Sequence, residues 1–511
     1  MRLKFIYLLL TITASIIASN NSNTSEKRCP GYTYYIDSNN GLDANDGLSP
    51  YRPWKSLNHV NAHEFTPGDS ILFKSGCEWT GQLRPKGSGS KDHPIVMESY
   101  GAGSFPKINQ GKIAGIVLLL QNQDQWEISH LDLSGGLPKP TQQVGGIHVQ
   151  ATTVGRVLKH IVIRDCIIRN IYGSVKLYES SAIWVGVPGW NDKNGLTTSF
   201  DDVLIENNKI YHSDRCGILV WTTAGPGSKS NFQSGLIPSK NVIIRGNVIE
   251  DIGGDAILVL GSDQPLVEKN IVKRCCLKAG NPALGTDYNA CAAAIWLHHC
   301  ERGIMQYNAV YDCLKLDKNK DGMAYDFDFN CNASILQYNY SRNNAGGFLL
   351  IMPSATNNIT RYNISENDRN RLLCLQGTRS DMNLVYNNTF YINSGASHII
   401  PRAYISNNIF MAEGSATIEV RNPDEGVFKN NCYSGNWSAL PSDQGKVVSD
   451  PQFINPGFGG YNAENLSCYN LNSTTPCKGK GIIIENNGGK DMNGTTISQS
   501  LPPDIGAFQA K

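Results

Sequence analysis

The sequence predicts an all-β protein, a right-handed parallel β-helix (a solenoid) with an N-terminal capping module, and two repeated features favour that fold. Short apolar strands, rich in β-branched residues and bounded by Gly and Asn, recur from about residue 164 to residue 433. An Asn accompanies each strand, at a basic interval of 20–24 residues that insertions lengthen: Asn207, Asn247, Asn270, Asn308, Asn339, Asn363, Asn387, Asn407 and Asn430. A repeat of this length is typical of stacked coils, and we expect the Asn side chains to pair from coil to coil inside an apolar rod.

The rest of the chain divides around this repeat. Residues 1–19 contain two basic residues, then an apolar run and then small residues, which is the pattern of a signal peptide. This pattern predicts a secreted protein, extracellular or periplasmic. We expect residues 32–110 to cap the open end of the rod, because an uncovered terminal coil is an unpaired sheet edge. Residues 111–453 are then the β-helix catalytic domain, and residues 454–511 an irregular C-terminal tail.

Composition excludes several classes of partner. A net charge of +1 with 17% charged residues argues against nucleic acid, which needs a basic surface. The apolar run near the N-terminus is too short to cross a bilayer, so we expect no membrane insertion. The Cys spacings do not fit a structural zinc site, so no metal is predicted. We expect a monomer.

One strand type can be aligned over seven coils: residues 146–150, 182–186, 217–221, 256–260, 294–298, 322–326 and 347–351. Strand alternation places one set of columns inside the rod, with Met323 and Leu350 among them, and the other set outside. The outward set contains His148, Trp184, Trp221, Trp296, His298 and Asp326, with Asp328 one step beyond. This alignment predicts a solvent-facing sheet on which His298 lies beside Asp326 and the aromatic rings bind sugars; alternatively, the Trp side chains cover apolar surface under inserted loops.

The two carboxylates are the candidate catalytic pair. Asp326 and Asp328 lie two residues apart on one strand, so their side chains point the same way and one pKa is raised by the other. Such a pair suits a glycosidase, retaining or inverting, although a D-x-D strand can also hold calcium or accept turn amides. Asp368 precedes a later strand and is a candidate third acid, or alternatively a turn cap.

The segments 321–352 and 359–368 resemble a signature of bacterial right-handed β-helix proteins. With the N-terminal module and the ending PDIGAF, the resemblance extends over most of the chain. These proteins include glycoside hydrolases of family 141, which are α-L-fucosidases and xylanases. The resemblance implies acid catalysis without a cofactor, carried here by Asp326, Asp328 and Asp368.

The predicted function is that of a secreted glycoside hydrolase acting on a plant or algal cell-wall-type polysaccharide or oligosaccharide. A polysaccharide lyase is the first alternative, with the Asp pair binding calcium and Arg369, Arg371 or Arg379 reaching in from turns. The aligned outward columns contain no Lys or Arg, which departs from the lyase pattern. A non-catalytic carbohydrate-binding rod is the second alternative, and it would not need paired carboxylates.

Overall fold

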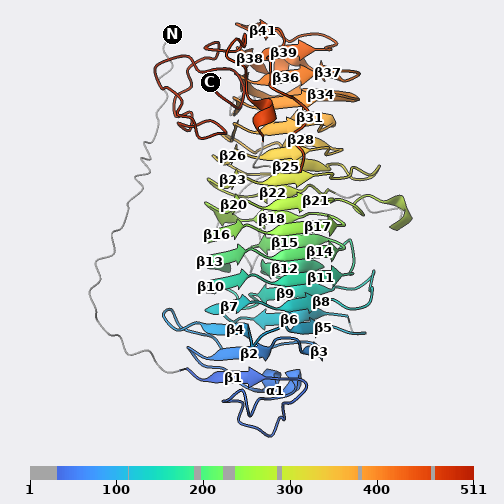
Figure 1. Ribbon diagram of the computed structural model, residues 1–511, viewed down its shortest axis with the longest axis vertical. Helices are drawn as coiled ribbons and strands as arrows, with labels where there is room; N and C mark the ends of the chain where they lie inside the picture. Colours follow the sequence, from blue (N-terminus) through green and yellow to red (C-terminus); the bar gives the residue numbers. More distant parts are fainter. Residues whose placement is uncertain are drawn as a thin grey trace, which may run out of the picture.

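The computed structural model shows a rod of stacked coils (Figure 1) and describes residues 31–112, 114–188, 197–222, 236–284, 291–377, 382–461 and 466–510. Within these residues three parallel sheets of 16, 14 and 11 strands follow the rod, so the predicted parallel β-helix is confirmed. The expected signal peptide lies outside the described residues. No helix in the described part of the chain is long and apolar enough to cross a membrane.

Sheet 1 has sixteen strands in the described residues: β1 (Thr33–Ile36), β2 (Ser70–Lys74), β4 (Ile95–Tyr100), β7 (Trp126–Ser129), β10 (Val157–Arg164), β13 (Ser199–Glu206), β16 (Ser239–Arg245), β20 (Leu266–Glu268), β23 (Ile304–Gln306), β26 (Ile335–Gln337), β29 (Ile359–Arg361), β32 (Asn383–Tyr386), β35 (Ala403–Ser406), β38 (Val427–Lys429) and β40 (Asp443–Gln444), with β19 (Ser262–Asp263) beside β16. Sheet 2 consists of β3 (Glu78–Thr80), β5 (Lys107–Asn109), β8 (Asp132–Ser134), β11 (Ile167–Ile171), β14 (Lys209–Ser213), β17 (Val248–Ile252), β21 (Ile271–Lys273), β24 (Ala309–Tyr311), β27 (Tyr340–Arg342), β30 (Ile364–Glu366), β33 (Thr389–Ile392), β36 (Ile409–Ala412), β39 (Cys432–Gly435) and β41 (Val447–Val448). Sheet 3 consists of β6 (Ile116–Gln121), β9 (Gly145–Gln150), β12 (Ser181–Gly186), β15 (Cys216–Trp221), β18 (Ile257–Leu260), β22 (Ile295–His298), β25 (Met323–Phe327), β28 (Gly347–Ile351), β31 (Asn370–Leu375), β34 (Ala396–Pro401) and β37 (Thr417–Val420). The helical elements are short: α1 (Leu57–Ala62), η2 (Pro282–Leu284), η3 (Pro423–Glu425) and η4 (Ser467–Tyr469).

A ladder of buried Asn amides connects successive coils. Asn270 donates from Nδ2 to Oδ1 of Asn308 at 3.0 Å, and Asn308 donates in the same way to Asn339 at 3.0 Å. In coils with an Asn-Asn pair the second residue joins the ladder: Asn208, Asn388, Asn408 and Asn431. The predicted members Asn207, Asn387, Asn407 and Asn430 instead precede it, with φ between 51° and 56°. That prediction is wrong by one residue because the corner needs a left-handed residue, and Asn tolerates this conformation.

The N-terminal residues continue the sheets of the rod. Strands β1, β2 and β4 pair in parallel and reach β7 without a break in sheet 1. Helix α1 buries Leu57 and Val60 in the main core, and the Ser56 side chain accepts from the His59 amide at its N-terminus. The capping role of residues 32–110 stays a prediction.

The C-terminal segment folds back along the rod (Figure 1, dark red). Tyr338 donates its hydroxyl to the Lys490 carbonyl at 3.0 Å, and Asn387 Nδ2 donates to the Asp504 carbonyl at 2.9 Å. Ile497 is buried in a cluster with tyrosines of sheet 1 and its corner. The segment therefore covers coils well before the last one.

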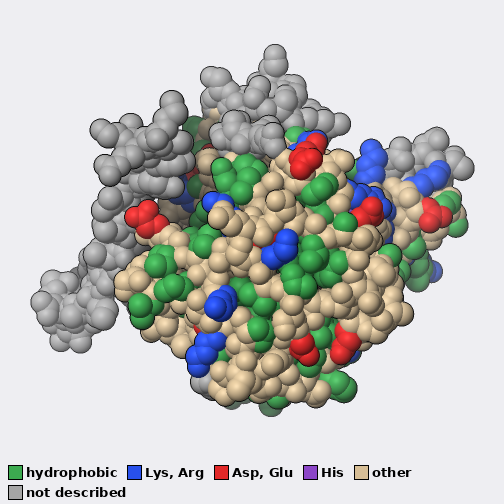
Figure 2. Space-filling model, turned by 90° about the horizontal axis from the view of Figure 1, so that it is seen from above, with side chains coloured by type: hydrophobic (Ala, Val, Ile, Leu, Met, Phe, Trp, Pro, Cys, Tyr) green, Lys and Arg blue, Asp and Glu red, His purple; other side chains and the backbone are tan. Residues whose placement is uncertain are grey.

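Seen end-on from above, acidic and basic side chains are scattered over the surface, in some places side by side (Figure 2).

The register of sheet 3 follows the sequence alignment only as far as β22. Ile257 pairs with Ile295 as predicted, but Asp326 pairs with Trp296 and not with His298. The predicted neighbourhood of His298 and Asp326 is wrong by two residues. Tyr325 does lie in the rod interior, as predicted, and donates its hydroxyl to the carbonyls of Asn308 and Tyr340 at 3.1 and 3.0 Å. The register shifts because Ala324 and Tyr325 both belong to the main core, which breaks the strict alternation along β25.

A second shift follows between β25 and β28. Leu350 pairs with Asp326, and both Leu350 and Met323 pack in the outward apolar cluster, so their predicted inward orientation is wrong. Leu349 and Ile351 belong to the main core instead. The outward face of sheet 3 is consequently more apolar near the two carboxylates than the alignment predicted.

Candidate active site

The candidate site lies on the outward face of sheet 3, around β18, β22, β25 and β31. Asp326 is on β25, between Trp296 of β22 and Leu350 of β28, and is only 3% exposed. An apolar cluster extends along the outward face of sheet 3 and includes both register partners of Asp326: Trp184, Leu219, Trp221, Leu258, Leu260, Ala293, Trp296, Met323, Leu350 and Cys374. The carboxyl group of Asp326 is therefore almost fully buried in an apolar environment.

This surrounding changes the protonation of Asp326. Its Oδ1 is buried and has no hydrogen-bond partner among the described residues. Burial, followed by the charges of Asp328 and Asp321, raises the pKa of Asp326 well above its ordinary value. The raised pKa favours the protonated form of Asp326.

Asp328 is half-buried and directly follows β25. It accepts a hydrogen bond from the Phe329 amide at 2.6 Å, which favours the ionised form. Burial outweighs that bond and, together with the charge of Asp255, raises the pKa of Asp328 to about 7. This carboxyl can exchange a proton near neutral pH.

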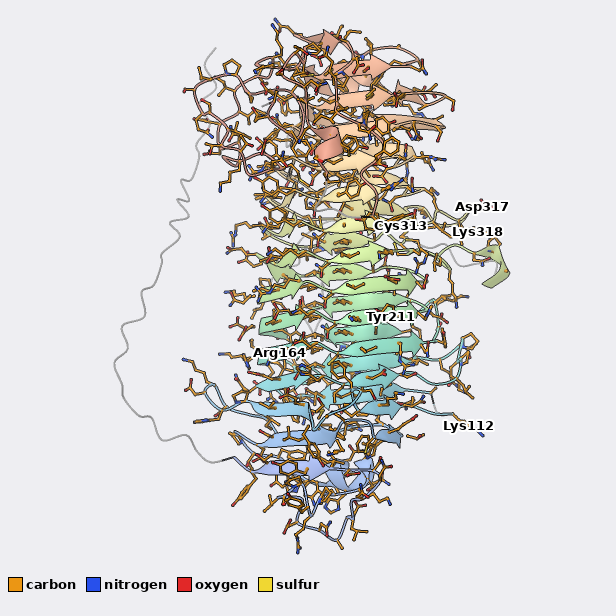
Figure 3. The ribbon with its side chains drawn as sticks, viewed as in Figure 1. Lys112, Arg164, Tyr211, Cys313, Asp317 and Lys318 are labelled. Atoms are coloured by element: carbon orange, nitrogen blue, oxygen red, sulfur yellow. The ribbon has the colours of Figure 1, made fainter. Side chains whose placement is uncertain are left out.

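Asp321 is a third carboxyl of the group, which the sequence analysis did not single out. It follows the excursion between β24 and β25, on which Figure 3 labels Asp317 and Lys318. Burial raises its pKa to about 6, with Arg371 opposing and Asp328 contributing. The Arg371 Nη2 atom lies 3.9 Å from Asp321 Oδ1, and the Asp321 side chain is 16% exposed. A DG pair before a strand indicates a turn, so no motif marked Asp321.

Asp255 anchors the aromatic side of the site. It is fully buried, pairs with Arg215 at 2.9 Å, and accepts the Trp296 indole N–H at 3.0 Å. The Arg215 guanidinium lies 4.0 Å from the centre of the Tyr178 ring. These contacts fix the orientation of Trp296 next to Asp326.

His298 lies opposite Asp328. The parallel ladder continues beyond β22, because the Asp328 amide donates to Leu297 O at 2.9 Å and the His299 amide to Phe329 O at 2.9 Å. His298 is 5% exposed, and its Nδ1 is 2.5 Å from His299 Nδ1. Burial lowers the pKa of His298 to about 3, so the imidazole is neutral.

The other predicted sugar-binding rings are buried. Trp184, Trp221 and Trp296 are 2%, 4% and 6% exposed and His148 is inaccessible, so the predicted solvent-facing column is wrong at these positions. The Trp184 ring lies against Gly186, where an added Cβ would come within 2.1 Å of the indole nitrogen. Burial lowers the pKa of His148 to about 4, and its Nε2 lies 3.2 Å from the Ser181 carbonyl. Their burial favours the alternative role of covering apolar surface.

Asp368 is not brought to this face. It is inaccessible, accepts the Ser365 hydroxyl at 2.7 Å and the Asn344 amide N–H at 2.9 Å, and also binds the Ser341 hydroxyl. Asn344 in turn accepts the Cys313 amide, so the two residues continue a second ladder. These contacts favour the alternative role of a turn cap.

The arrangement can therefore perform acid–base chemistry. Three carboxyl groups whose pKa values are raised by burial lie near a fixed indole ring. Of the arginines considered for a lyase, Arg371 reaches Asp321, while Arg379 lies outside the described residues. Among the described side chains, no group of three or more His, Cys, Asp or Glu is arranged to hold a metal ion.

Comparison with known proteins places the rod among characterised relatives. Residues 114–390 match the family described as right handed beta helix region. A lacto-N-biosidase of Bifidobacterium longum subsp. longum is 28% identical over 85% of this chain and 32% of its own length. The chain thus spans about a third of that relative.

Two solved structures share the fold. A GH136 lacto-N-biosidase from Eubacterium ramulus, as its selenomethionine derivative, has a TM-score of 0.58 at 22% identity, covering 82% of this chain and 68% of its own. XylC in complex with xylose has a TM-score of 0.50 at 11% identity, covering 93% of this chain and 98% of its own. They support the right-handed fold and not the narrower resemblance to family 141.

Proposed function

The chain belongs to the right handed beta helix family, and we propose that it is a glycoside hydrolase whose active site is the carboxylate group on the outward face of sheet 3. The observation that carries the proposal is the set of three neighbouring carboxyls, Asp321, Asp326 and Asp328, whose pKa values are all raised by burial. Glycoside hydrolysis needs one protonated and one ionised carboxyl on the same surface. The likeness to a lacto-N-biosidase supports the same reaction class.

Exposure suggests how the roles divide. Asp321 and Asp328 are half-buried and can reach a substrate, whereas Asp326 is almost fully enclosed. We assign Asp328 as the general acid, because its pKa of about 7 keeps it largely protonated below neutral pH. Asp321, beside Arg371, is ionised first and acts as base or nucleophile. Asp326, two residues before Asp328 on the same strand and beside Trp296, is assigned as a positioning residue.

The substrate proposal follows the relative. The name lacto-N-biosidase favours an oligosaccharide over a plant or algal cell-wall polysaccharide. An oligosaccharide containing lacto-N-biose is therefore the first compound to test. Trp296 is the predicted sugar-binding ring nearest to the acids, but it is 6% exposed and held by Asp255, so it forms a wall of the site rather than an open surface for stacking.

The test is product analysis by mass spectrometry in ¹⁸O-labelled water. One labelled oxygen per cleavage supports hydrolysis, whereas an unsaturated product without added water would establish a lyase and overturn the proposal. Asp328→Asn and Asp321→Asn should each lower kcat by about 10²-fold or more. Asp317→Asn, on the same excursion as Asp321, is the matched control and should leave kcat unchanged. Full activity in both Asp variants would contradict the assigned site.

A further inference from the structure

One corner of the rod contains tyrosines in a strained backbone conformation. The residue before each ladder Asn has a positive φ, between 51° and 66°: Asn207, Gly246, Lys269, Tyr307, Tyr338, Tyr362, Asn387, Asn407 and Asn430. Asn and Gly adopt this left-handed conformation readily, but a bulky side chain there is an outlier. Tyr residues at this position in three successive coils are therefore expected to have a role that compensates for the backbone strain.

The three rings form a continuous stack. Tyr307 and Tyr338 are 5.1 Å apart with an interplanar angle of 17°, and Tyr338 and Tyr362 are 5.8 Å apart at 13°. The C-terminal segment covers two of them, so Tyr338 is 7% and Tyr362 0% exposed. Tyr307 remains 47% exposed. Packing under the C-terminal segment explains why aromatic rings occupy positions 338 and 362, but it does not explain the exposed ring of Tyr307.

Tyr307 borders a cavity of about 580 Å³ between the rod and the C-terminal segment. The cavity combines aromatic and polar side chains: Lys269, Tyr307, Tyr311, Tyr461 and Asn493. The Tyr311 and Tyr461 rings are 5.0 Å apart, and Tyr461 is held by a hydroxyl hydrogen bond to Asp312 at 2.8 Å. Lys269 has no ion pair or side-chain hydrogen bond among the described residues.

We propose that this cavity is a second carbohydrate-binding site, in which a neutral pyranose unit of a glycan stacks on Tyr307. The stack fixes the ring of Tyr307 in advance, so binding would cost little side-chain freedom. A sugar has an apolar face for the ring and hydroxyl groups for Lys269 and Asn493, which matches a cavity lined by both aromatic and polar side chains. The site lies at the corner of sheets 1 and 2, away from the carboxylates of sheet 3, and does not depend on catalysis.

The geometry offers a variant that removes the ring without strain. Asn occupies the same corner in four other coils, so Tyr307→Asn should keep the fold and its melting temperature. Tyr404 is also 47% exposed, which makes Tyr404→Asn the matched control. Both variants would be applied to an array of neutral oligosaccharides in the Asp328→Asn background, where no probe is consumed.

The expected result is at least a 10-fold loss of affinity in Tyr307→Asn for one or more probes, with no change in Tyr404→Asn. With Asp328 intact, Tyr307→Asn should hydrolyse a short substrate at the unchanged rate, which separates this site from the proposed active site. Equal binding by Tyr307→Asn and its parent would overturn the proposal. Failure of the parent to bind any neutral oligosaccharide on the array would overturn it as well.

Discussion

Asp326 and Trp296 are register partners on neighbouring strands of sheet 3, so a carboxyl group and an indole ring lie side by side on the outward face. The indole N–H is already donated to Asp255, and the ring therefore excludes water from Asp326 without offering it a hydrogen bond. This relationship explains why the pKa of Asp326 is raised and why Asp328 and Asp321 remain the carboxyls that exchange protons.

The proposed roles predict a bell-shaped dependence of kcat/KM on pH. Activity should rise as Asp321 loses its proton near its pKa of about 6, and fall as Asp328 loses its proton near its pKa of about 7. Initial rates on a short oligosaccharide between about pH 4 and pH 9 would measure both limbs. A rate that stays constant up to pH 9 would contradict the role of Asp328 as acid.

Replacing Asp326 by Asn should change how stability depends on pH. The folded-state pKa of Asp326 is raised, so above the ordinary value the unfolded chain binds fewer protons and the free energy of unfolding decreases as pH rises. Asp326→Asn removes this contribution. The variant should therefore gain stability relative to the parent from pH 4 towards pH 8, measured by urea unfolding. A difference that does not vary with pH would refute the burial argument.

The buried pair of Asp255 and Arg215 is predicted to matter far more than an exposed pair. Asp255→Asn leaves the Arg215 charge without its carboxylate, which should cost about 3–5 kcal/mol in the free energy of unfolding. Glu419→Gln breaks the Arg421 pair, whose side chains are 53% and 52% exposed, and should cost less than about 1 kcal/mol. Urea unfolding of both variants provides the comparison, and similar losses would contradict it.

The one-residue correction to the ladder can be tested in a single coil. Asn208 donates to the Ile163 carbonyl at 2.9 Å and accepts the Cys166 amide at 3.0 Å, so Asn208→Ala leaves buried groups unpaired and should cost about 3 kcal/mol. Asn207 is exposed with φ of 56°, and Asn207→Gly should change stability by about 0.5 kcal/mol or less. Thermal unfolding would distinguish them; the reverse order would restore Asn207 as the ladder residue.

The fold was predictable because strand length, coil spacing and the Asn repeat all carry a period. The sequence does not predict which Asn of an Asn-Asn pair enters the ladder, because both residues have the same side chain. Only the backbone conformation of the corner distinguishes Asn207 from Asn208. The register beyond β22 was not predictable either. Strict alternation places both Met323 and Tyr325 inside the rod, whereas Met323 packs outward and Ala324 and Tyr325 are both in the core.

The candidate site was predictable where a strand carries it. Asp326, Asp328, Trp296 and His298 do share one face, although their pairing differs from the alignment. Asp321 was missed because it precedes a strand at a Gly-containing turn, where an acidic residue usually accepts backbone amides. Asp255 lies in the GGDA turn before β18, a position that predicts a structural role, and its contacts with Arg215 and Trp296 fit that role. Asp321 approaches Asp328 through the path of its excursion, which has no period.

The folded-back C-terminal segment has a consequence for how the rod unfolds. A solenoid whose coils touch only their neighbours can fray from either end, one coil at a time. Here, hydrogen bonds join Tyr338 to Lys490 and Asn407 to Ile482, so the last coils cannot detach while the segment stays bound. Amide hydrogen exchange should then show one cooperative opening unit from β26 to β39 and gradual fraying at β1. Exchange that accelerates stepwise towards β39 would show that the segment does not couple these coils.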